Sequence, residues 1–188
     1  MGWAVEDCGP DRLMVGTGTP SLAETVALTI AADDLGYGVA LVLPPYYYKP
    51  ASDEGLVAWY TALHEALGAR PIQVFFYNFP QMTGLTIQIS VIETLARRFP
   101  ARFTGIKDSS ADLDYCRAIV GLGLSLKVFP SSEGVLHHAR ADGFAGCISA
   151  TVNVTAPLCA QIWRDGGAAQ AGLVDRVAQA RASMAGPR

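Results

Sequence analysis

Short apolar runs alternate along the chain with longer stretches whose apolar residues recur every three or four positions. Because a strand buried in a parallel sheet is a short continuous apolar run, each run is expected to be a strand. The expected strands span residues 13–16, 39–43, 72–77, 103–107, 126–129 and 143–149. The spacing between them is typical of amphipathic helices, and its clearest stripe consists of Leu56, Trp59, Leu63 and Leu67. Six strand–helix units are therefore predicted.

The expected helices have recognisable ends. Ser21 and Glu24 have the spacing of a capping box, and Pro20 stands near the same helix start. Gly36 and Gly68 are expected to end the first two helices. Further helices are predicted over residues 89–99 and 112–120, through 136–137, and around 156–163. Residues 1–12 are expected to be irregular, and residues 167–188 to form a helical tail.

The alternation of strands and helices indicates parallel strands joined by right-handed crossovers. Two α/β architectures share this pattern, an open doubly wound sheet and a (β/α)8 barrel. Both place their sites at the carboxyl ends of the strands, where polar residues cluster in this sequence. The pattern alone leaves the choice between them open, within one domain of residues 1–188.

Composition narrows the class of protein. The 188 residues are 51% hydrophobic and 16% charged, which is enough apolar material for one sizeable core. A net charge of −3 with dispersed charges argues against nucleic acid binding. The chain shows no signal peptide pattern, and no apolar run reaches the length of a membrane span. Four cysteines without a CxxC pair indicate reduced thiols, so a cytoplasmic location is expected.

One expected strand ends in a lysine, Lys107. Side chains alternate between the faces of a strand, so Phe103, Gly105 and Lys107 are expected to share a face, with the glycine leaving room beneath the lysine. A desolvated lysine amine can act as a nucleophile on a carbonyl carbon. The alternative is a lysine at the strand end that is exposed or paired with Asp108.

The preceding strand ends in Tyr77. Consecutive strands are usually neighbours in space, so the Tyr77 hydroxyl is expected near Lys107. A phenol in that place can relay protons while a carbinolamine forms and collapses. The alternative is a tyrosine of the core or of an interface.

Other candidate sites have less support. Gly16–Gly18 would need a third glycine at Ser21 to form a GxGxxG phosphate loop. His137 and His138 are adjacent and so face different directions on a helix, which argues against a metal site. The run of tyrosines at 46–48 fits either a ligand platform or interface packing.

Five ordered motifs carry a resemblance to a known family. They are GTGTPSLAE at 16–24, PPYYYKP at 44–50, YNFP at 77–80, GIKDSS at 105–110 and GCISATVNV at 146–154. In these the sequence resembles the dihydrodipicolinate synthase / N-acetylneuraminate lyase family. The resemblance implies a (β/α)8 barrel, assembled as a homo-dimer or tetramer, with no metal and no organic cofactor.

The resemblance also implies roles for individual residues. Lys107 would form an imine with pyruvate or another 2-oxo acid, and Tyr77 would relay the proton. Tyr47 matches the tyrosine that enters a neighbouring subunit's site, and these three are the implied catalytic residues. In substrate binding, the backbone carbonyl of Ile148 would face the substrate.

Three further positions bear on the second substrate. Ser132 and Glu133 stand where sugar-acid-cleaving members hold substrate hydroxyl groups. Met82 stands in a Gln-Met-Thr-Gly turn where synthase members have a carboxylate-binding arginine. A thioether cannot replace a bidentate guanidinium, so a 2-oxo-3-deoxy sugar acid is expected in preference to aspartate semialdehyde.

By the same resemblance, the 188 residues begin at the family's third strand. The first two strands, and the threonine loop that binds the pyruvate carboxylate, have no counterpart in the sequence. Six units cannot close an eight-stranded barrel, so an incomplete barrel is expected. The sequence therefore leaves two functions open, an aldolase-type lyase and an inactive barrel remnant or 2-oxo acid binding protein.

Overall fold

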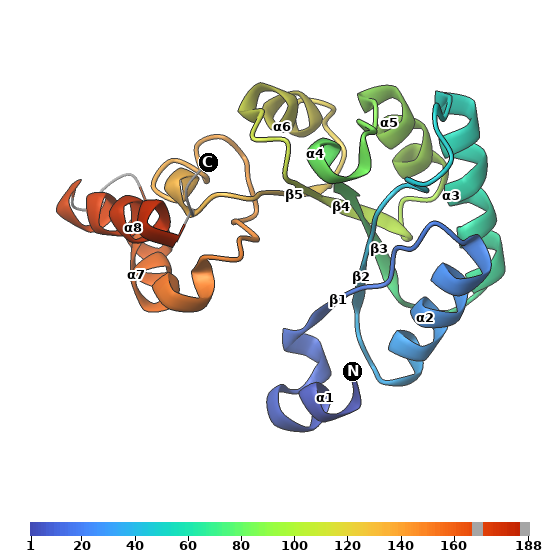
Figure 1. The fold of residues 1–188 in the computed structure, drawn as a ribbon, viewed down its shortest axis with the longest axis horizontal. Coiled ribbons are helices and arrows are strands. Elements are labelled where there is room, and N and C mark those ends of the chain that lie inside the picture. The colour runs from blue at the N-terminus through green and yellow to red at the C-terminus, as the bar shows by residue number, and fades with distance from the viewer. Residues whose placement is uncertain (167–170, 185–188) are drawn as a thin grey trace.

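The computed structural model describes residues 1–166 and 171–184, and its centre is one parallel sheet (Figure 1). The five strands follow one another in the order β1-β2-β3-β4-β5, and every neighbouring pair is parallel. They are β1 (Met14–Gly16), β2 (Val39–Val42), β3 (Gln73–Asn78), β4 (Phe103–Asp108) and β5 (Lys127–Pro130). Sequential order with helical crossovers is the connectivity of a (β/α) barrel wall, which confirms the predicted incomplete barrel.

Helices α2 (Leu22–Asp34), α3 (Asp53–Leu67), α5 (Ile89–Arg98) and α6 (Leu113–Val120) follow the outer side of the curved sheet (Figure 1). The main core lies between these helices and the sheet. It contains a set of aromatic rings in which Phe76 stacks on Phe103 at 5.1 Å and Tyr60 meets both edge-on. Full burial of one such side chain contributes about 1.5–3 kcal/mol, so this layer supplies much of the stability of the fold.

The helix ends follow the sequence signals. The Ser21 side chain accepts a hydrogen bond from the Glu24 backbone N–H at 3.3 Å, as the capping-box spacing predicted. Asp112 caps α6 by accepting from two backbone N–H groups. Gly36 and Gly68 come after α2 and α3, the first two helices that the sequence predicted, with positive φ angles of 85° and 54°, which glycine adopts without steric cost.

The predicted sixth strand at residues 143–149 is wrong. This segment makes two hydrogen bonds to β5, from Ala145 N–H to the Val128 carbonyl and from Ile148 N–H to the Pro130 carbonyl, but it forms no ladder. Gly146 has a φ of 145°, so the backbone leaves the extended conformation that a strand needs. The helix expected through 136–137 is likewise only a short 3-10 turn, η2 (Glu133–Val135), followed by further turns.

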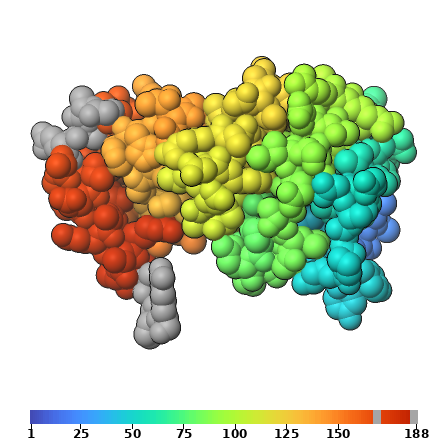
Figure 2. Space-filling view, turned by 90° about the horizontal axis from the view of Figure 1, so that it is seen from above, coloured from blue at the N-terminus to red at the C-terminus, as the bar shows by residue number. Residues whose placement is uncertain are grey.

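The two ends of the chain also contain helices. Residues 1–12 were expected to be irregular, but they form α1 (Gly2–Cys8) and η1 (Pro10–Arg12), separated by Gly9. Between the two ends, a further short helix, α4 (Pro80–Thr83), comes directly after β3. Helices α7 (Val152–Asp165) and α8 (Ala171–Met184) gather at the end of the molecule opposite α3 (Figure 2).

Helices α7 and α8 have a small core of their own. It consists of Leu136, Cys159, Ile162, Leu173 and Val177. Helix α8 lies within the predicted helical tail, of which residues 167–170 and 185–188 fall outside the described part. Over the residues described, no helix combines the length and the apolar character needed to cross a membrane.

Candidate active site

A cavity of about 370 Å³ opens where the carboxyl ends of β3, β4 and β5 meet the segment that precedes α7. Parallel strands bring the residues that follow each of them to one edge of the sheet. The cavity is lined by Tyr77, Phe79, Lys107, Ser109, Ser131, Ile148, Ser149, Ala150, Thr151, Arg181 and Met184. Its lining therefore combines an amine, a phenol, several hydroxyl groups and a guanidinium.

Lys107 and Tyr77 are direct partners in the β3–β4 register. The Lys107 Nζ donates a hydrogen bond to the Tyr77 Oη at 2.8 Å, and it also lies 4.0 Å from the centroid of the tyrosine ring. The Tyr77 ring stacks on Phe79 with centroids 5.7 Å apart, which limits its movement. The structure thus brings the amine and the phenol together, as the sequence predicted, at a distance that allows proton transfer.

The floor beneath Lys107 depends on Gly105. A Cβ at that position would lie 2.7 Å from the Lys127 carbonyl oxygen and 2.8 Å from the Phe75 ring. The Phe75 ring on β3 stacks on the Phe129 ring on β5 with centroids 5.9 Å apart, so the two rings meet over β4 and cover the glycine on the inner face. Gly105 therefore leaves room both for the Lys107 side chain and for the pair of rings of Phe75 and Phe129, called here the aromatic floor.

Phe103 does not share this face, contrary to the prediction. The register pairs Val74 with Phe103 and Phe75 with Gly105, so β4 contains an extra residue, Thr104, at a β-bulge. The bulge shifts the alternation by one position. Phe103 consequently lies in the main core on the outer side, while Gly105 and Lys107 face inward.

Asp108 is held on the outer side, so it is not the partner of Lys107. Its Oδ1 accepts a hydrogen bond from Asn78 Nδ2 at 2.8 Å, and its Oδ2 accepts from the Ser110 backbone and hydroxyl. Asn78 in turn accepts from the Ile87 N–H at 3.0 Å. This buried network fixes the ends of β3 and β4 directly behind Tyr77 and Lys107.

The other predicted site residues divide into two groups. Ile148 lines the cavity together with its neighbours Ser149 and Thr151. Tyr47 and Met82 do not, and their surfaces are 71% and 72% exposed. The Tyr47 ring meets Tyr48 edge-on at 5.1 Å, in a loop whose tip faces solvent in the single chain.

Ser132 and Glu133 are adjacent to the cavity without lining it. The Ser132 hydroxyl caps η2 by accepting from the Gly134 N–H at 3.2 Å. The Glu133 carboxylate is buried and bonded to Thr151 Oγ1 and to Arg181 Nη1, the latter at 2.7 Å. Glu133 was expected to contact hydroxyl groups of the substrate. In the structure its carboxylate oxygens already accept hydrogen bonds from protein groups, so its position does not fit that role.

The charge of Glu133 is stabilised by the same partners. Burial opposes ionisation, but hydrogen bonds from Thr151 and Ser149, together with the positive charge of Arg181, lower the pKa of the Glu133 carboxyl below its usual value. The carboxylate and the guanidinium therefore form a charged pair at the edge of the cavity.

The sequence prediction missed Arg181. This residue lies on α8, 48 positions beyond its partner Glu133, in a tail without any recognisable motif. Local periodicity contains no information about a contact across that distance. The only available signal was a cation near the end of a helix, which is too common to indicate a site.

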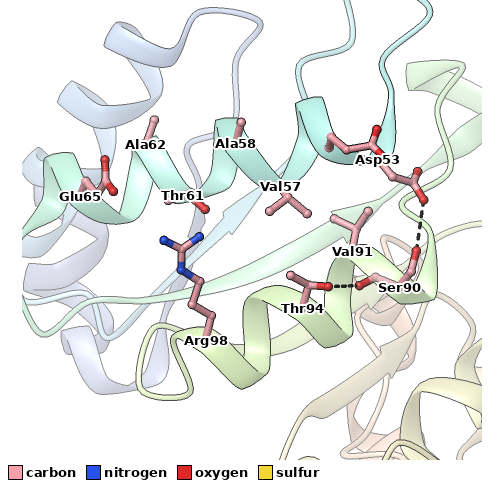
Figure 3. A pocket seen from close by; sticks show the side chains of 11 residues that line it. Asp53, Val57, Ala58, Thr61, Ala62, Glu65, Ser90, Val91, Thr94 and Arg98 are labelled. Carbon is pink, nitrogen blue, oxygen red and sulfur yellow. Dashed lines mark hydrogen bonds between the residues drawn. The ribbon is translucent and has the colours of Figure 1, made fainter.

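A larger groove, of about 710 Å³, lies on the outer face between α3 and α5 (Figure 3). Arg98 reaches from α5 toward α3, and Ser90 donates a hydrogen bond to Asp53 at the other end. This groove is a surface feature on the helical side of the sheet, remote from the strand ends. It has no part in the lysine–tyrosine site.

Comparison with known proteins identifies the family. Residues 9–184 match the model of the dihydrodipicolinate synthetase family. The chain is 37% identical over 142 residues to an uncharacterized DapA-like lyase of Chloroflexus aurantiacus, covering 76% of this chain and 47% of that protein. It is 32% identical over 162 residues to the 4-hydroxy-tetrahydrodipicolinate synthase of Rhodospirillum centenum, covering 84% and 54%. The chain thus spans about half the length of these curated relatives.

Solved structures agree with this assignment. YagE, a prophage protein of the dihydrodipicolinic acid synthase family from E. coli K12 in complex with pyruvate, superimposes with a TM-score of 0.81 at 26% identity. The match covers 95% of this chain and 60% of that one. Dihydrodipicolinate synthase from Agrobacterium tumefaciens gives a TM-score of 0.83 at 26% identity, covering 94% and 61%. Because the family model matches nearly the whole chain and the backbone follows these barrels, the chain belongs to the dihydrodipicolinate synthetase family.

Proposed function

We propose that this chain is an aldolase-type lyase that acts through an imine between Lys107 and a 2-oxo acid. The observation that carries the proposal is the 2.8 Å hydrogen bond between the Lys107 amine and the Tyr77 hydroxyl at the mouth of a polar cavity. Both side chains are half-buried, so a bound ketone has access to the amine from the cavity.

The chemistry follows from this pair. The Lys107 amine, once deprotonated, attacks the ketone carbon, and Tyr77 Oη gives a proton to the carbonyl oxygen and takes one from the attacking nitrogen, which leaves a neutral carbinolamine. A further proton from Tyr77 to the new hydroxyl group releases water and leaves the protonated imine beside a phenolate. In cleavage, the bond between the next two carbons breaks, its electron pair moves toward the imine cation to give an enamine, and the phenolate takes the proton of the hydroxyl group on the departing carbon. Bond formation is the reverse of this step.

The substrate class rests on two observations. YagE and the dihydrodipicolinate synthase of Acinetobacter baumannii were both solved with pyruvate, which supports a 2-oxo acid as the partner of Lys107. Met82 stands in the turn after β3 where a synthase would present an arginine. We therefore propose a 2-oxo-3-deoxy sugar acid, rather than aspartate semialdehyde, as the compound cleaved or formed.

The proposal extends to assembly and location. Tyr47 and its neighbour Tyr48 are exposed at a loop tip, which supports a homo-oligomer in which this loop reaches another subunit. Cys8, Cys116 and Cys147 are free thiols, as is Cys159, which supports a reducing cytoplasmic location.

Trapping the imine tests the proposal. The chain contains only three lysines, Lys49, Lys107 and Lys127, so peptide mapping assigns an adduct without ambiguity. Borohydride reduction in the presence of pyruvate should add one carboxyethyl group to Lys107. The Lys107→Ala variant should give no adduct, and Lys127→Ala, which alters a lysine at the opposite end of the neighbouring strand, should react like the parent. A folded parent protein without adduct would contradict the imine.

A second candidate is a 2-oxo acid binding protein without turnover. Met14 on the inner side of β1 is 41% exposed, and within the described residues this strand pairs only with β2. The inner face of the sheet is therefore open to water at one edge, which favours hydrolysis of the imine over carbon–carbon chemistry. Saturable pyruvate binding with no cleavage of any 2-oxo-3-deoxy sugar acid would favour this candidate.

A further inference from the structure

Arg181 is a cationic side chain that reaches the Lys107 cavity from an element far away in the sequence. It belongs to α8, and it lines the cavity together with Lys107 and Tyr77. Its side chain is 38% exposed, so part of the guanidinium is open to a ligand.

The donors of Arg181 are used unevenly. Its Nη1 makes the bonds to protein, to Glu133 at 2.7 Å, Ser149 Oγ at 2.9 Å and Thr151 Oγ1 at 3.1 Å. Within residues 1–166 and 171–184, neither Nη2 nor Nε has a hydrogen-bond partner. Because the five N–H groups of a guanidinium lie in one plane, fixing Nη1 leaves a pair of donors in a defined direction.

Glu133 holds the guanidinium in place. Its buried carboxylate is bonded by Thr151 and Thr155 as well as by Arg181, so it has little freedom to rotate. The lowered pKa of its carboxyl keeps it ionised near neutral pH. An arginine oriented in this way loses little conformational entropy when it binds a second anion.

The chemistry of a 2-oxo acid matches this arrangement. Its carboxylate is bonded directly to the ketone carbon, so the group that binds the carboxylate and the amine that attacks the ketone must line the same cavity. Arg181 and Lys107 do so. A guanidinium pairs with a carboxylate through two parallel hydrogen bonds, which sets the orientation of the ketone as well as its affinity.

We propose that Arg181 binds the carboxylate of the 2-oxo acid whose ketone reacts with Lys107, and that Glu133 is its positioning residue. This inference rests on the proposed function for the identity of the ketone. It assigns substrate recognition to a residue of the C-terminal helix, outside the strand ends that carry the lysine and the tyrosine.

Two ketones of similar size separate recognition from a structural role. Pyruvate carries the carboxylate, and hydroxyacetone replaces it with a neutral hydroxymethyl group. Borohydride trapping on Lys107 is measured against the concentration of each ketone for the parent, Arg181→Ala, Arg181→Lys and the matched control Arg176→Ala, which removes an exposed arginine from the same helix. Arg181→Ala should raise the half-saturating pyruvate concentration about 10- to 100-fold and leave hydroxyacetone unchanged.

The remaining variants refine the result. Arg181→Lys should lie between the parent and Arg181→Ala for pyruvate, because an ammonium retains the charge without the planar pair of donors. Arg176→Ala should match the parent for both ketones. If Arg181→Ala raised the half-saturating concentration equally for both ketones, the residue would have a structural role and the proposal would be overturned. An unchanged half-saturating concentration of pyruvate would overturn it outright.

Failure of the proposed function can be distinguished from failure of this inference. If neither ketone labels the parent protein, calorimetric titration with oxamate, a carboxylate that resembles pyruvate and forms no imine, still tests Arg181. Binding to the parent and to Arg176→Ala but not to Arg181→Ala would support the carboxylate site. Equal binding to Arg181→Ala, or no binding to the parent, would refute it.

Discussion

Replacing Gly105 with alanine is expected to damage both the stability and the chemistry of the site. The added Cβ would lie 2.7 Å from the backbone carbonyl oxygen of Lys127 and 2.8 Å from the Phe75 ring. Ordinary contacts of this kind are about a full ångström longer at their energy minimum. The Lys127 carbonyl cannot move away by itself, because it belongs to β5, which pairs with β4. The Phe75 ring cannot move away easily either, because it stacks on Phe129.

Overpacking of a well-filled interior typically costs about 1–3 kcal/mol. We expect Gly105→Ala to lower the free energy of unfolding by an amount in the upper half of that range, because one of the clashing atoms is backbone. Urea unfolding followed by circular dichroism measures the change as a shift of the midpoint at constant slope. The rate of borohydride trapping at Lys107 should fall as well, since the lysine stands one step further along the same inner face.

The matched control is Gly16→Ala on β1. A Cβ at Gly16 would meet nothing within 4 Å, and the glycine has no positive φ angle. This substitution should leave stability within about 0.5 kcal/mol of the parent or raise it slightly by restricting the unfolded chain. If Gly105→Ala proves as stable as Gly16→Ala and traps pyruvate at the same rate, the account of the aromatic floor is wrong.

Three further predictions follow from the site and its surroundings. Tyr77→Phe should slow trapping by about 10²- to 10⁴-fold with an unchanged urea midpoint, and an unchanged rate would exclude the phenol as the proton relay. Glu133→Gln should lower the free energy of unfolding, measured in urea at pH 7, by about 1–3 kcal/mol. Because the pKa of Glu133 is lowered in the folded state, its ionised carboxylate stabilises the protein above the unfolded pKa, and this stabilisation is lost as pH falls through the folded pKa. The free energies of unfolding of parent and variant should therefore converge in acid. A difference between them that stays constant with pH would contradict this. Iodoacetamide should label exposed Cys8 rapidly and spare Cys116, because burial and the nearby Asp108 charge raise the pKa of the Cys116 thiol. Mass spectrometry of the labelled native protein measures both positions, and equal labelling would contradict the buried position of Cys116.

The regular part of the fold was predictable because it follows from local periodicity. Five of the six expected strands form, each within one or two residues of its expected bounds. The sixth failed because the sequence shows a glycine at position 146 but not its backbone conformation, and at a φ of 145° that backbone leaves the extended region. Two hydrogen bonds to β5 show that the segment still follows the sheet, so its placement was correct although its conformation was not.

The bulge at Thr104 illustrates a second limit. Simple alternation placed Phe103 on the face of Gly105 and Lys107, but an extra residue in β4 moved Phe103 to the outer core. Register is decided by packing between two strands, and only one of them is visible in a local pattern. The prediction for Lys107 survived because it stands beyond the bulge, on the same side as Gly105.

The sequence by itself determined the alternation of strands and helices, the family, and the pairing of Lys107 with Tyr77, because each depends on local spacing or on the neighbourhood of consecutive strands. Only the tertiary structure decided which polar groups share the cavity with them. It turned Asp108 to the outer face, buried Glu133, and brought Arg181 from the last described helix to the strand ends. Such contacts join residues many positions apart, and they follow from how whole elements pack, which no local pattern encodes.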